Sequence, residues 1–119
     1  MVLPIKRFYK RGQTDLTLEK LNQRTDISYR SLINVLRQTI LDGGCIDSGL
    51  AHSLIDRANL NVHQLTAIVS VMEQGYETFG IAARRDPLKS PIAQKYDSVR
   101  RYAESKMDFL RAKRSIGEL

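Results

Sequence analysis

The strongest constraint on the fold is a helical pattern that occurs twice within residues 18–71. The second copy follows the first after 33 residues, and each copy has a short amphipathic segment, a break and a longer amphipathic segment. Identical residues occupy three matched positions, Leu21 and Leu54, Arg24 and Arg57, and Leu32 and Leu65. The pattern predicts an all-α protein, a compact helical domain with one or two helix-turn-helix-like units.

The break in each copy carries Asp26 or Asn59, residue types that tolerate a left-handed backbone because their short polar side chains bond locally. The next residue is apolar and is expected to fill the corner between the helices. This layout is that of a helix-turn-helix, whose second helix lies in the DNA major groove. An ordinary αα-hairpin has the same layout, so other features have to distinguish a DNA-binding helix-turn-helix from a purely structural hairpin.

The second helix of the first copy is predicted over residues 29–41, with an apolar inner stripe and a polar outer stripe. Ser28 is suited to cap its start, and Gly43 and Gly44 to end it. Arg, Asn and Gln form bidentate hydrogen bonds with guanine and adenine. The predicted DNA-binding residues of this helix are Arg30, Ser31, Asn34, Arg37 and Gln38. A solvated helix face collects the same residue types, and that alternative stays open.

Residues 1–14 form a basic arm before the helical core. Its four cations bracket Phe8 and Tyr9, and they are Lys6, Arg7, Lys10 and Arg11. Such an arm can neutralise phosphates or enter a minor groove, so these four residues join the predicted DNA-binding set. A short strand, or an arm without nucleic-acid contact, is the alternative.

The second helix of the second copy, predicted over residues 62–74, contains no Lys or Arg and has apolar groups on nearly all sides. Gly75 and Gly80 follow and predict the connection that ends it. Such a helix is poorly suited to approach DNA and belongs in the core or in a subunit interface. Together with the last helix it supplies the predicted interface residues Leu65, Ile68, Val71, Met72, Tyr96, Val99 and Leu110.

A long last helix is predicted from the pair Ser90 and Pro91, a cap followed by a residue with a preset φ angle. The predicted organisation is an arm over residues 1–14, a helical core over 15–83, a linker over 84–90 and a long basic C-terminal helix over 91–119. The basic face of that helix either contacts the phosphate backbone of a nucleic acid or is exposed to solvent without a partner.

Positive charge is concentrated at the two ends of the chain. Residues 1–15 carry a net charge of +3 and residues 84–119 carry +5, within a total of +6 for 119 residues. A pI near 9.7 favours a nucleic-acid partner, although an acidic protein or an anionic membrane surface also fits. No apolar run is long enough to span a bilayer, so no membrane partner is expected. The single cysteine, Cys45, excludes an intrachain disulfide and favours the cytoplasm.

Two segments are similar to parts of a known family, Ile27-Ser-Tyr with Leu32 and Leu36, and Val62-His-Gln-Leu-Thr-Ala-Ile-Val. The first resembles the leucine-serine-tyrosine start of the first long helix, and the second the helix after the central turn, in the family of the flagellar master activator FlhD and its relatives on conjugative elements. The resemblance covers residues 27–79. The resemblance implies an all-helical homodimer that activates transcription in a larger complex with a second DNA-binding subunit. DNA contact would then be shared, and these helices would mostly serve dimerisation.

These features predict a DNA-binding transcriptional regulator, or a regulator subunit, that forms a homo-oligomer in the cytoplasm. The alternative is a small helical protein–protein interaction adaptor, secretion- or phage-associated, with no direct DNA contact. No enzymatic activity is expected, because the sequence has no glycine-rich phosphate loop, paired-carboxylate motif or nucleophile–base set. Cofactors and metals are not expected either, since His52 and His63 lack partners at ligand spacing.

Overall fold

The computed structural model describes residues 17–117, and the side chains of residues 17–113; over that range it contains helices and turns but no strand. The helices are α2 (Leu18–Asn22), α3 (Tyr29–Leu41), α4 (Ser48–Arg57), α5 (Val62–Ala82), the 3-10 helix η1 (Pro87–Lys89) and α6 (Ser90–Gly117). The prediction of an all-α domain with a long C-terminal helix is therefore confirmed. No helix in this range is both long enough and apolar enough to cross a bilayer.

The helices of the two repeated units begin at polar side chains that satisfy free backbone N–H groups of the first turn. These caps are Thr17, Ser28, Asp47 and Asn61, and each accepts a hydrogen bond from the backbone N–H three residues further on. The predicted cap at Ser28 is confirmed. Asn61 and Gln64 also form a reciprocal capping box, so α5 has the most fully satisfied start.

The corners of the two units differ. Asn59 has a φ angle of 53°, in the left-handed region, and lies in the four-residue turn from α4 to α5. Asp26 does not adopt this conformation, and six residues separate α2 from α3. The second unit therefore has the tight corner typical of a helix-turn-helix, and the first has an open one. As predicted, Gly43 and Gly44 follow directly on the end of α3, after Leu41 and Asp42, and their φ angles are 109° and 84°.

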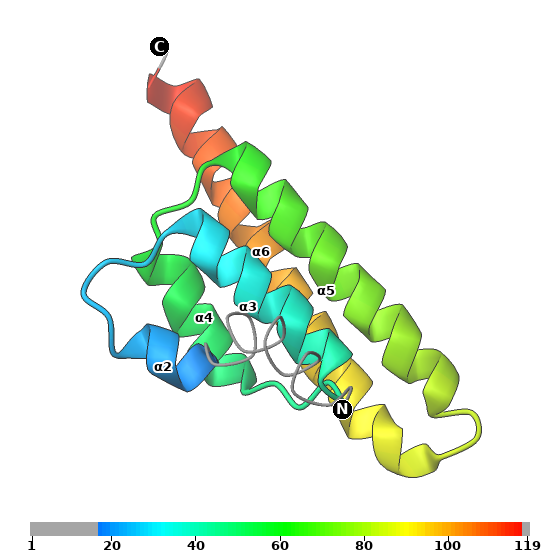
Figure 1. Ribbon diagram of the computed structural model, residues 1–119. Helices are drawn as coiled ribbons and strands as arrows, with labels where there is room; N and C mark the ends of the chain where they lie inside the picture. The colour runs from blue at the N-terminus through cyan, green and yellow to red at the C-terminus, as the bar shows by residue number, and fades with distance from the viewer. Residues whose placement is uncertain (1–16, 118–119) are drawn as a thin grey trace.

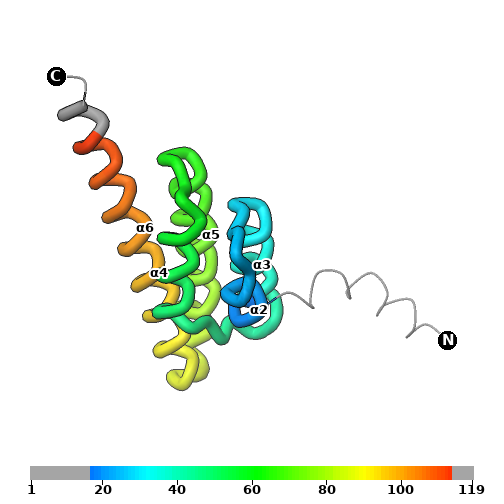
Figure 2. The backbone as a smooth tube through the Cα atoms, turned by 90° about the vertical axis from the view of Figure 1, so that its left-hand side faces the viewer, coloured from blue at the N-terminus to red at the C-terminus, as the bar shows by residue number. Residues whose placement is uncertain are grey.

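The helices are arranged in three layers (Figures 1 and 2). In Figure 1, α2 and α3 form the front layer, α4 and α5 the middle layer, and α6 the back. The helices α5 and α6 run antiparallel and are joined through η1. Since α3 packs on the middle layer from one side, its opposite side meets no other helix of the described chain.

The core between α5 and α6 is built around Tyr96, which is fully buried. Its ring stacks on Phe79 with a centroid separation of 5.6 Å and lies over Gly75. A β-carbon at Gly75 would come within 2.5 Å of the Tyr96 ring, so glycine is what permits the close approach of the two helices. Burial raises the pKa of Tyr96 above its ordinary value.

Two element boundaries differ from the prediction. The helix expected to end near residue 74 continues as α5 to Ala82, because Gly75 is packed under Tyr96 inside the helix instead of ending it. The expected linker over residues 84–90 contains η1, which Asp86 caps. Ser90 already has helical backbone angles, so α6 follows η1 directly without the separate cap that was predicted.

The predicted interface residues lie in the core of the single chain described. Six of them are at most 4% exposed, namely Leu65, Ile68, Val71, Met72, Tyr96 and Val99. Leu110 is partly buried against the same core. The apolar stripe of α5 is covered by the apolar stripe of α6 from the same chain. The sequence pattern required an apolar surface to cover each stripe, but it did not indicate whether that surface came from the same chain or from another copy. The predicted homo-oligomer and its interface stay a prediction.

Candidate nucleic-acid interface

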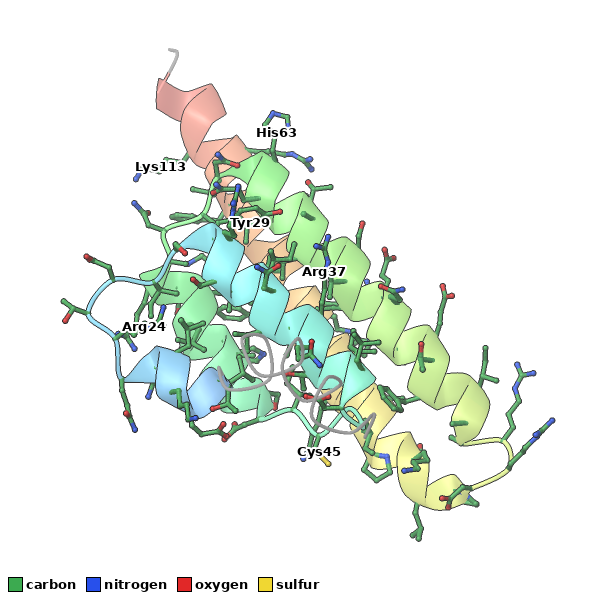
Figure 3. All side chains as sticks on the ribbon, in the orientation of Figure 1. Arg24, Tyr29, Arg37, Cys45, His63 and Lys113 are labelled. Atoms are coloured by element: carbon green, nitrogen blue, oxygen red, sulfur yellow. The ribbon has the colours of Figure 1, made fainter. Side chains whose placement is uncertain are left out.

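The outer side of α3 carries a stripe of polar residues, Arg30, Asn34 and Arg37, which we call the α3 stripe. All three are exposed to solvent. Leu32 and Leu36, on the inner side of the same helix, are fully buried and fix the rotation of α3 about its axis. Figure 3 shows Arg37 on α3 in the front layer, with α6 behind that helix. The stripe is therefore presented outward by a packed helix.

Among the residues that the structure describes, no carboxylate neutralises the α3 stripe. Within residues 17–113, neither Arg30 nor Arg37 forms a salt bridge, and the side chain of Asn34 forms no hydrogen bond. The donors of these three side chains thus face water, in positions from which they can bind an external acceptor.

Two predicted DNA-binding residues lie beside the stripe and are engaged elsewhere. The Ser28 hydroxyl donates to the Ser31 hydroxyl oxygen at 2.9 Å, and Gln38 Nε2 donates to Asp42 Oδ1 at 3.0 Å. Gln38 borders a hollow of about 170 Å³ between α2, α3 and the start of α4. Three carboxylates also line this hollow, those of Glu19, Asp42 and Asp47. These acids disfavour a phosphate beside Gln38, and the DNA contacts of Ser31 and Gln38 stay a prediction.

Leu41 extends the stripe by another turn and is 77% exposed. It follows Arg30 by eleven residues, a spacing that returns to the same side of an α-helix, and this signal was overlooked in the sequence. The predicted contacts Lys6, Arg7, Lys10 and Arg11 lie outside the described residues, and their part in the surface stays a prediction.

The cations in the middle of α6 are paired, unlike those of α3. Arg100 binds Asp97 at 2.6 Å and Glu104 at 2.7 Å, and Arg101 binds Asp97 at 2.9 Å. The hydrogen bond with Asp97 is the main reason that the pKa of Arg100 is raised. The arginines in the middle of α6 are therefore neutralised by carboxylates of the same helix, which favours the solvated interpretation there, whereas Arg111 and Lys113 form no salt bridge within residues 17–113.

A polar cluster connects α4 to α6 on another side of the bundle. The imidazole of His52 stacks on the Tyr102 ring at 4.4 Å, and Ser98 Oγ lies 3.5 Å from His52 Nε2. The Tyr102 hydroxyl donates to Asp56 at 2.6 Å, and Lys106 forms a salt bridge with the same carboxylate. Asp56 is thus occupied by Tyr102 and Lys106, and these side chains do not assemble a serine–histidine–carboxylate relay.

The pKa of Asp56 reflects opposing effects within this cluster. Partial burial raises the pKa, whereas the hydrogen bonds from Lys106 and Tyr102 lower it and outweigh burial, so the net shift is downward. The hydrogen bond between the Tyr102 hydroxyl and Asp56 raises the pKa of Tyr102. These contacts join α4 to α6.

In the described part of the chain, no group of three His, Cys, Asp or Glu side chains could hold a metal ion.

Arg57 positions the connection that leads into α3. Its guanidinium donates to the backbone oxygen of Asn22 at 2.8 Å, to the side-chain oxygen of Asn22 at 2.6 Å, and to the backbone oxygen of Arg24. Arg24, its counterpart in the first repeat, is exposed and lies on the connection between α2 and α3 (Figure 3). The repeated arginine therefore has a structural part in one unit only, which the sequence match did not reveal.

Comparison with known proteins gave no match to any protein-family model, curated protein or solved structure. The resemblance to the FlhD family therefore stays a sequence-based prediction, and so does the homodimer that it implies.

Proposed function

We propose that this protein is a DNA-binding transcriptional regulator, or the regulator subunit of a larger complex, that contacts DNA through the outer side of α3. The observation that carries this proposal is the α3 stripe, three exposed side chains on an outer helix with no carboxylate partner among the described residues. Arginine binds guanine and asparagine binds adenine through paired hydrogen bonds. A helix of 13 residues is about 20 Å long, which suits the major groove.

The electrostatics of α3 support the same choice. An arginine held by a neighbouring carboxylate must break that pair before it binds a phosphate, whereas Arg30 and Arg37 need not. Arg30 also lies in the first turn of α3, where the positive end of the helix dipole adds to the attraction for an anion. We assign base or phosphate contacts to Arg30, Asn34 and Arg37, and additional phosphate contacts to the cations of the N-terminal arm.

The second candidate is a helical protein–protein interaction adaptor without direct DNA contact. Exposed Leu41 at the end of the α3 stripe favours it, because a large apolar side chain beside arginines suits a protein contact. The apolar faces of α5 and α6 do not add support, since they are buried against each other within the chain.

Fluorescence-anisotropy titration of random-sequence duplex DNA over a salt series tests the proposal. The wild-type protein is expected to bind at low salt and to lose affinity steeply as salt rises, because phosphate contacts release counterions. The double variant Arg30→Glu with Arg37→Glu is expected to lose binding while keeping its helicity and melting temperature, since both side chains are exposed.

The matched control is Arg84→Glu with Arg85→Glu, which makes the same change in charge at exposed positions beyond the end of α5. It should retain most of the DNA affinity. The proposal is overturned if the wild-type protein does not bind duplex DNA at low salt, or if the α3 variant binds as tightly as wild type.

A further inference from the structure

The connection between α5 and α6, residues 81–89, forms a tip that is both apolar and basic. Figure 1 shows it at one extremity of the molecule, beyond the ends of α3 and α4. Ile81 is 62% exposed and Leu88 is 82% exposed, the highest value among the large apolar side chains described. Arg84 and Arg85 are also exposed, and Lys89 is partly so. Apolar groups left in water beside cations indicate a contact surface.

The charge of the tip is not balanced locally. Residues 78–96 contain one acid, Asp86, and four basic residues, which are Arg84, Arg85, Lys89 and Lys95. The Asp86 carboxylate accepts a hydrogen bond from the Leu88 backbone N–H at 3.1 Å and caps η1. No salt bridge within residues 17–113 involves any of the four cations. The tip, residues 81–89, carries three cations against Asp86 and thus has a local net charge of +2. Its cations are unpaired within residues 17–113, in contrast to Arg100 and Arg101 further along α6.

The backbone of the tip has its donors satisfied internally. The N–H groups of residues 83–86 donate to carbonyl oxygens of Phe79, Ile81 and Ala82, and the N–H of Lys89 donates to the carbonyl oxygen of Asp86. The N–H of Leu88 is bound by the Asp86 side chain, and Pro87 has no N–H. An unpaired N–H is costly in an apolar medium. This tip can therefore approach such a medium without that penalty.

We infer that the tip docks on the surface of an anionic lipid bilayer. Leu88 and Ile81 would enter the boundary between headgroups and acyl chains, while Arg84, Arg85 and Lys89 lie among the lipid phosphates. A protruding turn with apolar side chains and flanking cations suits a broad, anionic and partly apolar surface. Such a peripheral contact needs no membrane-spanning helix, and it is independent of DNA binding by the α3 stripe.

Vesicle flotation tests the inference with two lipid compositions, phosphatidylcholine alone and phosphatidylcholine with roughly one third phosphatidylserine. The wild-type protein is expected to float with the phosphatidylserine vesicles at low salt and to remain unbound with phosphatidylcholine alone. Each basic residue near an anionic surface contributes roughly fivefold in affinity. Arg84→Glu with Arg85→Glu should therefore reduce binding by at least about a hundredfold. Leu88→Ser should reduce it by roughly tenfold through lost apolar burial.

The control is the α3 variant, Arg30→Glu with Arg37→Glu, which should keep vesicle binding within about threefold of wild type because its charges lie on another helix. Equal flotation with both compositions, or retained flotation of the tip variant, overturns the inference. The same variants are titrated with duplex DNA. If only the tip variant loses DNA binding, the tip binds nucleic acid and both proposals are overturned. If only the α3 variant loses DNA binding, DNA binding belongs to α3 and vesicle binding is tested independently of it.

Discussion

The helices α3 and α5 occupy matched positions of the same repeated pattern, yet the structure places them in opposite surroundings. The 13-residue α3 lies in the outer layer and presents to solvent two arginines that form no salt bridge within residues 17–113. The 21-residue α5 lies in the middle layer and packs along α6 for most of its length. The inner stripes are alike, Leu32 matching Leu65. Helical periodicity therefore defines which side of each helix is apolar. The neighbouring helices decide whether the opposite side is exposed to solvent or packed against another helix.

The largest expected effect concerns the close contact of α5 with α6, which α3 lacks. Gly75→Leu should lower the free energy of unfolding by about 3 kcal/mol or more, because its side chain would collide with the Tyr96 ring. Gly80→Ala, in the same helix, is the control. No atom lies within 4 Å of its added β-carbon, so this variant should be more stable by about 0.5 to 1 kcal/mol. Urea denaturation measures both, and equal effects would mean that the glycines serve no packing role.

Exchange of charge between the two helices tests their different roles directly. His63 and Ser70 of α5 match Arg30 and Arg37 of α3, and both are exposed. A transposed variant carries Arg30→His, Arg37→Ser, His63→Arg and Ser70→Arg and keeps the same composition. We expect its affinity for duplex DNA to fall by at least about tenfold, because the arginines then lie on the middle layer instead of the outer helix. Unchanged affinity would show that net charge alone drives binding.

The helix caps provide a smaller comparison between the units. Ser28→Ala and Asn61→Ala should each cost about 1 kcal/mol of stability, through the loss of the hydrogen bond to the first turn. Asn61→Ala leaves the second bond of the capping box in place, because Gln64 Oε1 accepts from the Asn61 backbone N–H. Adding Gln64→Ala to Asn61→Ala should therefore lower the stability further. Thermal unfolding of the single and double variants measures this step, and no additional loss in the double variant would contradict the view that the capping box anchors α5.

The smallest effect belongs to the polar contact that joins α4 of the second unit to α6. Since the folded-state pKa of Asp56 is lowered from 3.8, its contribution is present at neutral pH and is lost as pH falls below that value. The carboxylate is partly exposed, so Asp56→Asn should cost less than about 1 kcal/mol at pH 7. The difference between variant and wild type should shrink toward pH 3. A constant difference across that range would assign the effect to packing instead of charge.

Much of the candidate site was predictable from α3 alone. Arg30, Asn34 and Arg37 share one helical side in the sequence, and the structure leaves that side exposed. Ser31 and Gln38 were placed in the same group, but their neighbours Ser28 and Asp42 engage them. Ser28 and Asp42 compete with an external ligand for these side chains, and residue type alone does not reveal that they lie within hydrogen-bonding distance. The basic, apolar tip was missed because residues 84–90 were interpreted as a linker, and exposure of Leu88 depends on how η1 turns the chain into α6.

The sequence by itself determined the all-helical class, the start of α3 at Ser28 and the apolar stripes, because caps and periodicity act over a few residues. Tertiary structure alone decided that the stripes of α5 and α6 cover each other, that Gly75 continues a helix, and that Arg57 and not Arg24 holds the first corner. These outcomes depend on which surfaces meet across the folded chain. An apolar stripe requires a partner, but its spacing does not specify which partner it meets.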